Sequence, residues 1–181
     1  MLKLQDLKPS SNWILDDTNK ILSMKCKDVS FPLNDKDLLL VNKMVNYIDA
    51  SYEERDQEFD IKGGIAIAAP QVGCDKKIIY LHFFDGQEEQ KYLLANPKIV
   101  ATSVAMCYLK SGEGCLSVKK EYQGHVKRFN KVKVEAFDML NNKPITINAE
   151  GLLSICLQHE IDHLSGILFY QRIDKKTAFP W

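Results

Sequence analysis

The chain has 181 residues, of which 45% are hydrophobic and 27% are charged, as is typical of a globular protein with a buried core. Lys+Arg and Asp+Glu each number 24, so the formal net charge is zero and gives no electrostatic reason to expect nucleic acid or an anionic membrane as a partner. The five cysteines are an odd, scattered set, no apolar run approaches the ~20 residues that span a bilayer, and no signal peptide is evident. These features predict one domain over residues 1–181, in the reducing cytoplasm.

The first third of the chain predicts an irregular segment followed by a long amphipathic helix. Residues 1–34 contain several breakers, among them Pro9 and Pro32. From Asn34 to Phe59 the apolar residues recur at intervals of three and four, and Asn34 or Asp35 is placed to cap the helix. The recurring apolar residues are Leu38, Val41, Met44, Val45, Ile48 and Tyr52.

The rest of the chain predicts several strands and one C-terminal helix. Residues 62–73, KGGIAIAAPQVG, are too rich in Gly and Ala for a packed strand and too short for a helix. Strand patterns follow at 76–84, 91–95, 98–109, 127–140 and 144–147. A helix is predicted over residues 149–165, with Gly166 as its end, and residues 167–173 are predicted to be extended. This order indicates an α+β fold with antiparallel strands packed around the C-terminal helix.

The hexapeptide Gln158–His163, QHEIDH, predicts a metal site on that helix. Residues four apart lie on one helix face, so His159 and His163 can converge on one cation. Glu160 lies about 100° around the helix, from which it can reach a metal-bound water without being a ligand. The alternative is a pair of ordinary histidines, but apolar residues surround the motif, and a buried helix rarely carries such polar groups unless they are paired or coordinated.

A site of this kind usually has three protein ligands and one open position, so a third ligand must come from elsewhere. Cys156 is close in sequence, but it is about 7.5 Å along the helix axis from the level of the metal, beyond the reach of a thiolate. The best remaining candidate is Cys115, in a turn where Gly112 and Gly114 allow close approach of the backbone. A set of one sulfur and two imidazoles suits Zn²⁺, Fe²⁺, Co²⁺ or Ni²⁺, and ligand type alone does not choose among them.

Three segments in this order give a resemblance to a known family. They are Gly64–Gln71 (GIAIAAPQ), Glu113–Ser117 (EGCLS) and Gln158–His163. The chain resembles the peptide deformylases, in particular their longer bacterial subtype, over at least residues 63–172. One position departs from the family pattern, because Ala66 replaces the second glycine of the first motif. We expect its methyl group at most to narrow the substrate cleft, with activity retained.

The resemblance implies metal-dependent hydrolysis of the N-formyl group from the N-terminal formyl-methionine of new polypeptides, with release of formate. Cys115, His159 and His163 would hold the metal, and Glu160 would act as general base and then general acid. The Gln71 side chain and the Leu116 backbone N–H would stabilise the oxyanion. The family commonly uses Fe²⁺, with Zn²⁺, Ni²⁺ or Co²⁺ as alternatives. Nascent formyl-methionyl peptides are the expected partners, and the ribosome is a further one.

The resemblance also implies a substrate cleft around these residues. The backbone of residues 64–66 would pair with the extended peptide, and an apolar pocket would hold the methionine side chain. The residues predicted to bind substrate are Gly64, Ala66, Gly114, Leu152, Ile155 and Cys156. Asp162 is predicted either to orient the helix or Arg128 or to be a solvated carboxylate, and Glu113 to anchor its glycine turn.

Three other functions remain as alternatives at this point. A zinc-dependent endopeptidase would share the His-Glu-x-x-His chemistry but would not need the Glu-Gly-Cys-Leu-Ser segment. A binding-only homologue of formylated N-termini is disfavoured, because the ligand residues, Glu160 and Gln71 are all present. A structural metal module would need a fourth protein ligand, and none is evident.

Overall fold

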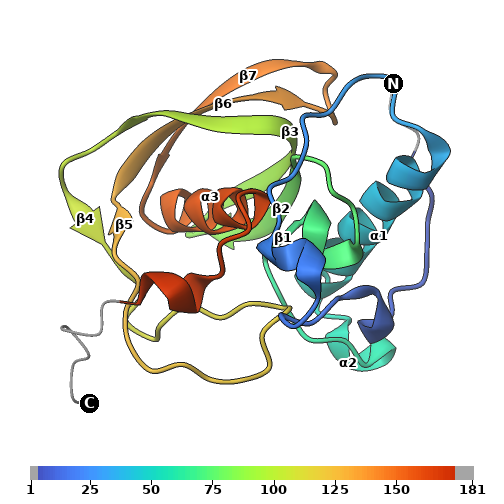
Figure 1. Ribbon diagram of the computed structural model, residues 1–181, viewed down its shortest axis with the longest axis horizontal. Coiled ribbons are helices and arrows are strands. Elements are labelled where there is room, and N and C mark those ends of the chain that lie inside the picture. The colour runs from blue at the N-terminus through green and yellow to red at the C-terminus, as the bar shows by residue number, and fades with distance from the viewer. Residues whose placement is uncertain (1–3, 174–181) are drawn as a thin grey trace.

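The computed structural model describes residues 4–173, and Figure 1 shows the arrangement of its elements. The N-terminal segment is irregular as predicted, apart from two 3-10 turns, η1 (Ser11–Trp13) and η2 (Lys20–Ser23). The first long helix, α1, runs over Asp35–Tyr52, and the Asn34 side chain caps it by accepting the N–H of Asp37 at 2.8 Å.

The prediction of a single helix to Phe59 is wrong beyond Tyr52. Glu54 has φ +58°, a left-handed conformation that no helix can continue through, and a separate short helix, α2, follows over Asp56–Phe59. The last residue before the next segment, Asp60, is again left-handed, with φ +50°. Two left-handed residues within one polar stretch therefore turn the chain back toward the sheet.

The Gly- and Ala-rich stretch forms more regular structure than its composition predicts. Ala66–Ala68 is a short strand, β1, and Ala69–Val72 is a 3-10 turn, η3. β1 pairs only with one neighbour and lies at the edge of the sheet, where small side chains are tolerated. Its own neighbour, β2 (Ile78–Asp85), supplies the bulky side chains that the stretch lacks.

The main sheet has five antiparallel strands in the order β1-β2-β3-β6-β7. Its remaining members are β3 (Glu88–Thr102), β6 (Lys131–Asp138) and β7 (Lys143–Glu150). One strand, β3, includes the strand predicted at 91–95 and the first part of that predicted at 98–109, since the chain passes Asn96 as a bulge with φ +52° instead of a turn. The prediction is wrong after Thr102, where β3 ends. A second sheet consists of two short antiparallel strands of two residues each, β4 (Met106–Cys107) and β5 (Arg128–Phe129).

The two long helices lie on opposite faces of this sheet. Along β2, Ile78 and Tyr80 pack in the core beneath α1, whereas Ile79 and Leu81 pack in the core beneath α3, because alternate side chains point to opposite faces. Figure 1 shows α3 (Gly151–Leu164) within the bend of the sheet, which confirms the predicted α+β arrangement around the C-terminal helix. Gly166, with φ +73°, follows its end as predicted.

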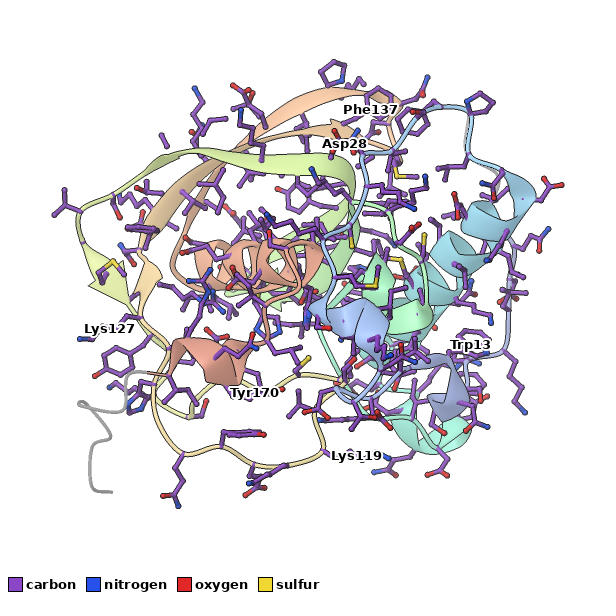
Figure 2. The ribbon with its side chains drawn as sticks, viewed as in Figure 1. Trp13, Asp28, Lys119, Lys127, Phe137 and Tyr170 are labelled. Carbon is purple, nitrogen blue, oxygen red and sulfur yellow. The ribbon has the colours of Figure 1, made fainter. Side chains whose placement is uncertain are left out.

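The final segment packs against the long loop before β5. A 3-10 turn, η4 (Phe169–Arg172), takes the place of the predicted extended piece at 167–173. Tyr170 of this turn stacks on Tyr122 of the loop with ring centroids 4.4 Å apart, and Figure 2 labels Tyr170 together with Lys119 of that loop. Between residues 4 and 173, no helix combines the length and the apolar character needed to cross a bilayer.

Candidate metal centre and cleft

Three buried side chains from two distant segments meet at one point. One ligand atom from each of Cys115, His159 and His163 lies within 4.8 Å of the others, and no other group of His, Cys, Asp and Glu in residues 4–173 meets this condition. The Cys115 Sγ lies 3.3 Å from His163 Nε2. The two histidines share a face of α3, as the i, i+4 spacing predicts, and Cys115 arrives from the turn after Gly114.

The donor set fits a divalent cation. His159 Nδ1 is bonded to Glu113 Oε2 at 2.8 Å, which leaves Nε2 for a ligand. Burial opposes a charge on His159, but its hydrogen bonds with Cys115 and Glu113 outweigh burial and raise its pKa to about 10. Burial and the neighbouring His159 hold the pKa of His163 well below its usual value. One sulfur and two imidazoles thus converge in a buried position, and this donor set suits a divalent cation.

Glu160 lies beside these residues, and one oxygen of its carboxyl group makes no hydrogen bond in the described part of the chain. The residue is buried, and this oxygen is Oε2. Burial raises the pKa of this carboxyl to about 7, partly offset by His159. An unpartnered buried carboxyl oxygen is uncommon, and at an active site it indicates a group that awaits a ligand or a proton.

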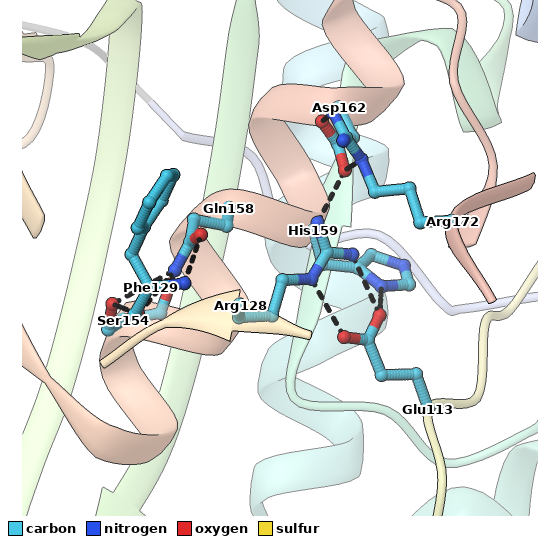
Figure 3. A network of polar contacts seen from close by, with 8 residues as sticks. All are labelled: Glu113, Arg128, Phe129, Ser154, Gln158, His159, Asp162 and Arg172. Carbon is cyan, nitrogen blue, oxygen red and sulfur yellow. Dashed lines mark hydrogen bonds and ion pairs between the residues drawn. The ribbon is translucent and has the colours of Figure 1, made fainter. Parts of the chain in front are cut away.

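A chain of charged side chains holds the ligand helix and the ligand turn together (Figure 3). Arg128 donates two hydrogen bonds to Glu113, from Nε to Oε1 at 2.8 Å and from Nη2 to Oε2 at 2.9 Å. Its Nη1 donates to Asp162 Oδ2 at 2.5 Å. Arg172 also bonds Asp162. Burial raises the pKa of Glu113, but Arg128 and His159 outweigh it and lower that pKa to about 2, so the carboxylate is ionised.

The predicted contact of Asp162 with Arg128 is therefore present, and so is an anchoring role for Glu113. What sequence reasoning missed is that Glu113 also fixes the ring of His159. The sequence did contain an indication of this contact. A metal-bound histidine commonly donates a hydrogen bond from its second ring nitrogen to a carboxylate, and Glu113 is the acidic residue nearest to Cys115 in sequence.

Gln71 and Leu116 lie around the same point. The Gln71 Oε1 accepts the N–H of Ala68 at 2.8 Å, which turns Nε2 toward Ser117 Oγ at 3.2 Å and Cys115 Sγ at 3.5 Å. Gln71 is almost fully buried, so this orientation is fixed by the fold. No hydrogen bond of residues 4–173 uses the backbone N–H of Leu116.

A cleft of about 270 Å³ opens beside the three ligands. Its apolar side comes from α3, and its other sides come from the segment before β1 and from the ligand turn. Every predicted substrate-binding residue lines it, namely Gly64, Ala66, Gly114, Leu152, Ile155 and Cys156. Cys156 lines the cleft but does not join the ligand group, in agreement with the argument from reach.

The departure at Ala66 causes no backbone strain. Ala66 is not among the described residues with positive φ, and it pairs in register with Leu81 as the first residue of β1. Its methyl group lines the cleft. The expectation that the methyl narrows the cleft without disturbing the backbone is thus compatible with the geometry, and its effect on activity stays a prediction.

Comparison with known proteins finds similarity to peptide deformylases in both sequence and structure. The family model described as polypeptide deformylase matches residues 11–179. Peptide deformylase from Malacoplasma penetrans is 46% identical over 96% of this chain and 93% of its own length, and that from Mycoplasma genitalium is 44% identical over 96% and 89%. A plant peptide deformylase structure matches with a TM-score of 0.72 and 29% identity over 97% of this chain and 86% of that one. A deformylase from Vibrio parahaemolyticus bacteriophage VP16T, solved with actinonin, matches with a TM-score of 0.67 and 37% identity over 86% and 98%.

Proposed function

The chain belongs to the peptide deformylase family, and from this premise we propose which of its residues carry out the reaction. It is a hydrolase that removes the formyl group from nascent peptides. The family is metal-dependent, and Cys115, His159 and His163 form the site that would hold the ion. The observation that carries this assignment is the meeting of these three ligand atoms next to an unpartnered carboxyl oxygen of Glu160.

A bound divalent ion would polarise the formyl carbonyl and lower the pKa of a water molecule. We propose Fe²⁺ in the cell, as the family resemblance implies, although the donor set also suits Zn²⁺, Ni²⁺ and Co²⁺. The protein would act in the cytoplasm on formyl-methionyl chains as they leave the ribosome. Residues 1–181 would form one catalytic domain, an assignment supported by the packing of both long helices on a single sheet.

Glu160 would move the proton. Its carboxylate would take a proton from the attacking water and then give it to the amine that leaves, as one group can do when it lies within reach of both. The buried position of Glu160 in the cleft wall and its unused Oε2 support this role.

Gln71 and Leu116 would stabilise the oxyanion that develops on the formyl oxygen. The Gln71 side-chain N–H₂ and the Leu116 backbone N–H are both donors beside Cys115, and the second is free of any bond in residues 4–173. Donors that are held in place before the reaction stabilise the transition state more than the substrate. Loss of one such donor typically raises the barrier by about 2.7–4 kcal/mol.

The substrate would enter with its first side chain toward α3. Leu152, Ile155 and Cys156 provide an apolar wall that suits the unbranched, polarisable methionine side chain. The backbone of residues 64–66 leads into the edge strand β1, whose free edge can pair with an extended peptide. Gly64 and Gly114 line this part of the cleft, and the methyl group of Ala66 would narrow it.

The test is formate release from a short formyl-methionyl peptide by anaerobically purified, metal-loaded protein. We expect Glu160→Gln to keep its metal and to lose about 10²–10⁴-fold in kcat, the usual contribution of a positioned acid–base group. Glu135→Gln, an exposed change on β6, serves as control. Unaltered turnover by the Glu160 variant would remove that residue from the mechanism, and internal fragments without formate would identify an endopeptidase instead.

A further inference from the structure

One lysine joins the two walls of the cleft. Lys62 lies two residues before Gly64, and its Nζ donates to the carbonyl oxygen of Cys115 at 2.8 Å and to that of Val118 at 3.2 Å. Cys115 and Val118 are the two ends of the turn that carries the ligand sulfur, and the Val118 N–H closes this turn onto the Cys115 oxygen at 3.2 Å. A single ammonium group thus binds both ends of the ligand turn.

The backbone around Lys62 is itself fixed. The N–H of Gly64 donates to Ser51 Oγ of α1 at 2.9 Å, and the N–H of Ile61 donates to the backbone carbonyl oxygen of Asp56 at 3.0 Å. A Cβ placed on Gly64 would lie only 3.0 Å from the Leu116 side chain, so the two walls are already in contact there. Lys62 therefore ties the ligand turn to α1, a rigid element on the far face of the sheet.

The geometry of one peptide bond gives this contact a consequence for catalysis. The carbonyl oxygen of Cys115 and the N–H of Leu116 belong to the same planar unit. In a trans peptide these two groups point in opposite directions, so a donor that holds the oxygen also fixes where the N–H points. A hydrogen bond from a charged donor is stronger than a neutral one, and it polarises the amide that it binds.

We propose that Lys62 is a positioning residue that orients the Cys115–Leu116 peptide for oxyanion stabilisation and holds the ligand turn in place. The inference rests on the function proposed above, since it assigns a role to the Leu116 N–H in that reaction. Lys62 acts through the peptide and not on the substrate, which separates it from a residue that binds the formylated peptide directly.

Kinetics of Lys62→Met, Lys62→Arg and the exposed control Lys133→Met test the role in turnover. We expect Lys62→Met to lose about 10- to 100-fold in kcat with little change in KM, because a displacement of ~1 Å in a catalytic group can cost ~10²-fold. Lys62→Arg keeps a cationic donor and should recover most of the rate. A change confined to KM would make Lys62 a substrate contact and overturn the proposal, as would an Arg variant no better than the Met variant.

A second readout is independent of activity. Cys-Leu occurs at only two places in the chain, 115–116 and 156–157, so Zn²⁺-loaded protein carrying carbonyl-¹³C cysteine and ¹⁵N leucine gives two correlated amide signals. The Cys156→Ser variant loses the Leu157 signal, so the signal that remains is assigned to Leu116. We expect Lys62→Met to shift the Leu116 signal while that of Leu157 stays in place, and Lys62→Arg to move it back.

An unshifted Leu116 signal in Lys62→Met would overturn the proposal, whatever the kinetics. The two failures can be told apart. If wild-type protein releases no formate, the proposed function fails, while the Leu116 signal still tests whether Lys62 orients this peptide. If wild-type protein releases formate and Lys62→Met matches it in kcat, only the inference about Lys62 fails.

Discussion

Two buried cysteines lie at the cleft, but only one belongs to the ligand group. Cys115 Sγ is 3.3 Å from His163 Nε2, whereas Cys156 lines the apolar wall one turn before His159. Burial and the nearby Glu160 raise the pKa of the Cys156 thiol far above its usual value, so it is a poor thiolate donor. The two sulfurs therefore differ in position, and burial keeps the Cys156 sulfur as a neutral thiol.

This difference gives a direct comparison of two conservative variants. We expect Cys115→Ser to weaken Zn²⁺ binding by more than the ~10- to 100-fold that is typical for loss of a residue supporting a ligand. Cys156→Ser should retain its metal, since its sulfur is not a ligand. Competition against a chromophoric chelator measures both affinities, and loss of metal from the Cys156 variant alone would show that the ligand assignment is wrong.

Glu113 supports His159 from behind the metal position. Its Oε2 accepts from His159 Nδ1 at 2.8 Å, and Arg128 holds both of its oxygens. Glu113→Gln leaves Arg128 buried beside a neutral amide and weakens the support of the imidazole. We expect about a 10- to 100-fold loss in metal affinity, measured by the same competition, with Glu135→Gln unchanged. A Glu113 variant that binds metal as tightly as wild type would make this contact purely structural.

Sequence reasoning reached the three candidate ligands and the contact of Asp162 with Arg128, but it missed two contacts of the ligand turn. His159 and His163 could be predicted from their spacing on a helix, and Cys115 from its glycine-flanked turn once the reach of a thiolate had excluded Cys156. The contact of Glu113 with His159 and that of Lys62 with Cys115 join residues 46 and 53 positions apart. The first could have been expected from the usual carboxylate partner of a metal-bound histidine, whereas no pattern in the sequence indicates the second.

At the level of elements, the Gln158 side chain is one of the groups that hold α3 to the small sheet. Gln158 Oε1 accepts the N–H of Phe129 at 3.0 Å, and its Nε2 donates to the Phe129 oxygen at 2.9 Å, so it substitutes for a missing strand partner of β5. Ser154 Oγ donates to the same oxygen at 2.8 Å. The first residue of the QHEIDH motif is thus structural, and it fixes α3 one residue before the ligand His159.

Removal of this amide should be costly. Gln158→Ala leaves the buried backbone groups of Phe129 with fewer partners, and we expect a loss of about 1–3 kcal/mol in the free energy of unfolding. Gln87→Ala, in the exposed turn between β2 and β3, should change it by less than about 0.5 kcal/mol. Urea denaturation of the Zn²⁺-loaded proteins measures both, and equal stability of the two variants would contradict the anchoring role.

The elements that the sequence predicted well are those whose boundaries have a local cause. The Asn34 cap and Gly166 mark helix ends through their own conformations and bonds. The strand β1 was not predicted, because Ala66–Ala68 takes its strand conformation from pairing with Ile79–Leu81, a tertiary effect that outweighs the weak preference of alanine for strands.

At the level of the whole molecule, the irregular N-terminal segment closes over the end of the metal-binding helix. The N–H of Cys26 donates to the Leu164 oxygen at 2.9 Å, and a Cβ on Gly166 would lie 2.6 Å from the backbone carbon and oxygen of Ser23. The sequence predicted that residues 1–34 are irregular but not where they lie, because no periodic pattern connects them to α3.

Two glycines allow this close approach to be measured separately from backbone strain. Gly166 and Gly86 have similar positive φ values, +73° and +65°, but a Cβ on Gly86 would meet nothing within 4 Å. Gly86→Ala should therefore lose only the ~1–2 kcal/mol that a left-handed alanine costs. Gly166→Ala must in addition displace the Ser23 backbone, and we expect about 1–3 kcal/mol more, as for an overpacked core. Both free energies of unfolding are compared at saturating Zn²⁺, since bound metal adds to apparent stability. If the two variants lose equal stability, the Ser23 backbone moves aside at no measurable cost, and the packing of the N-terminal segment contributes little to the position of α3.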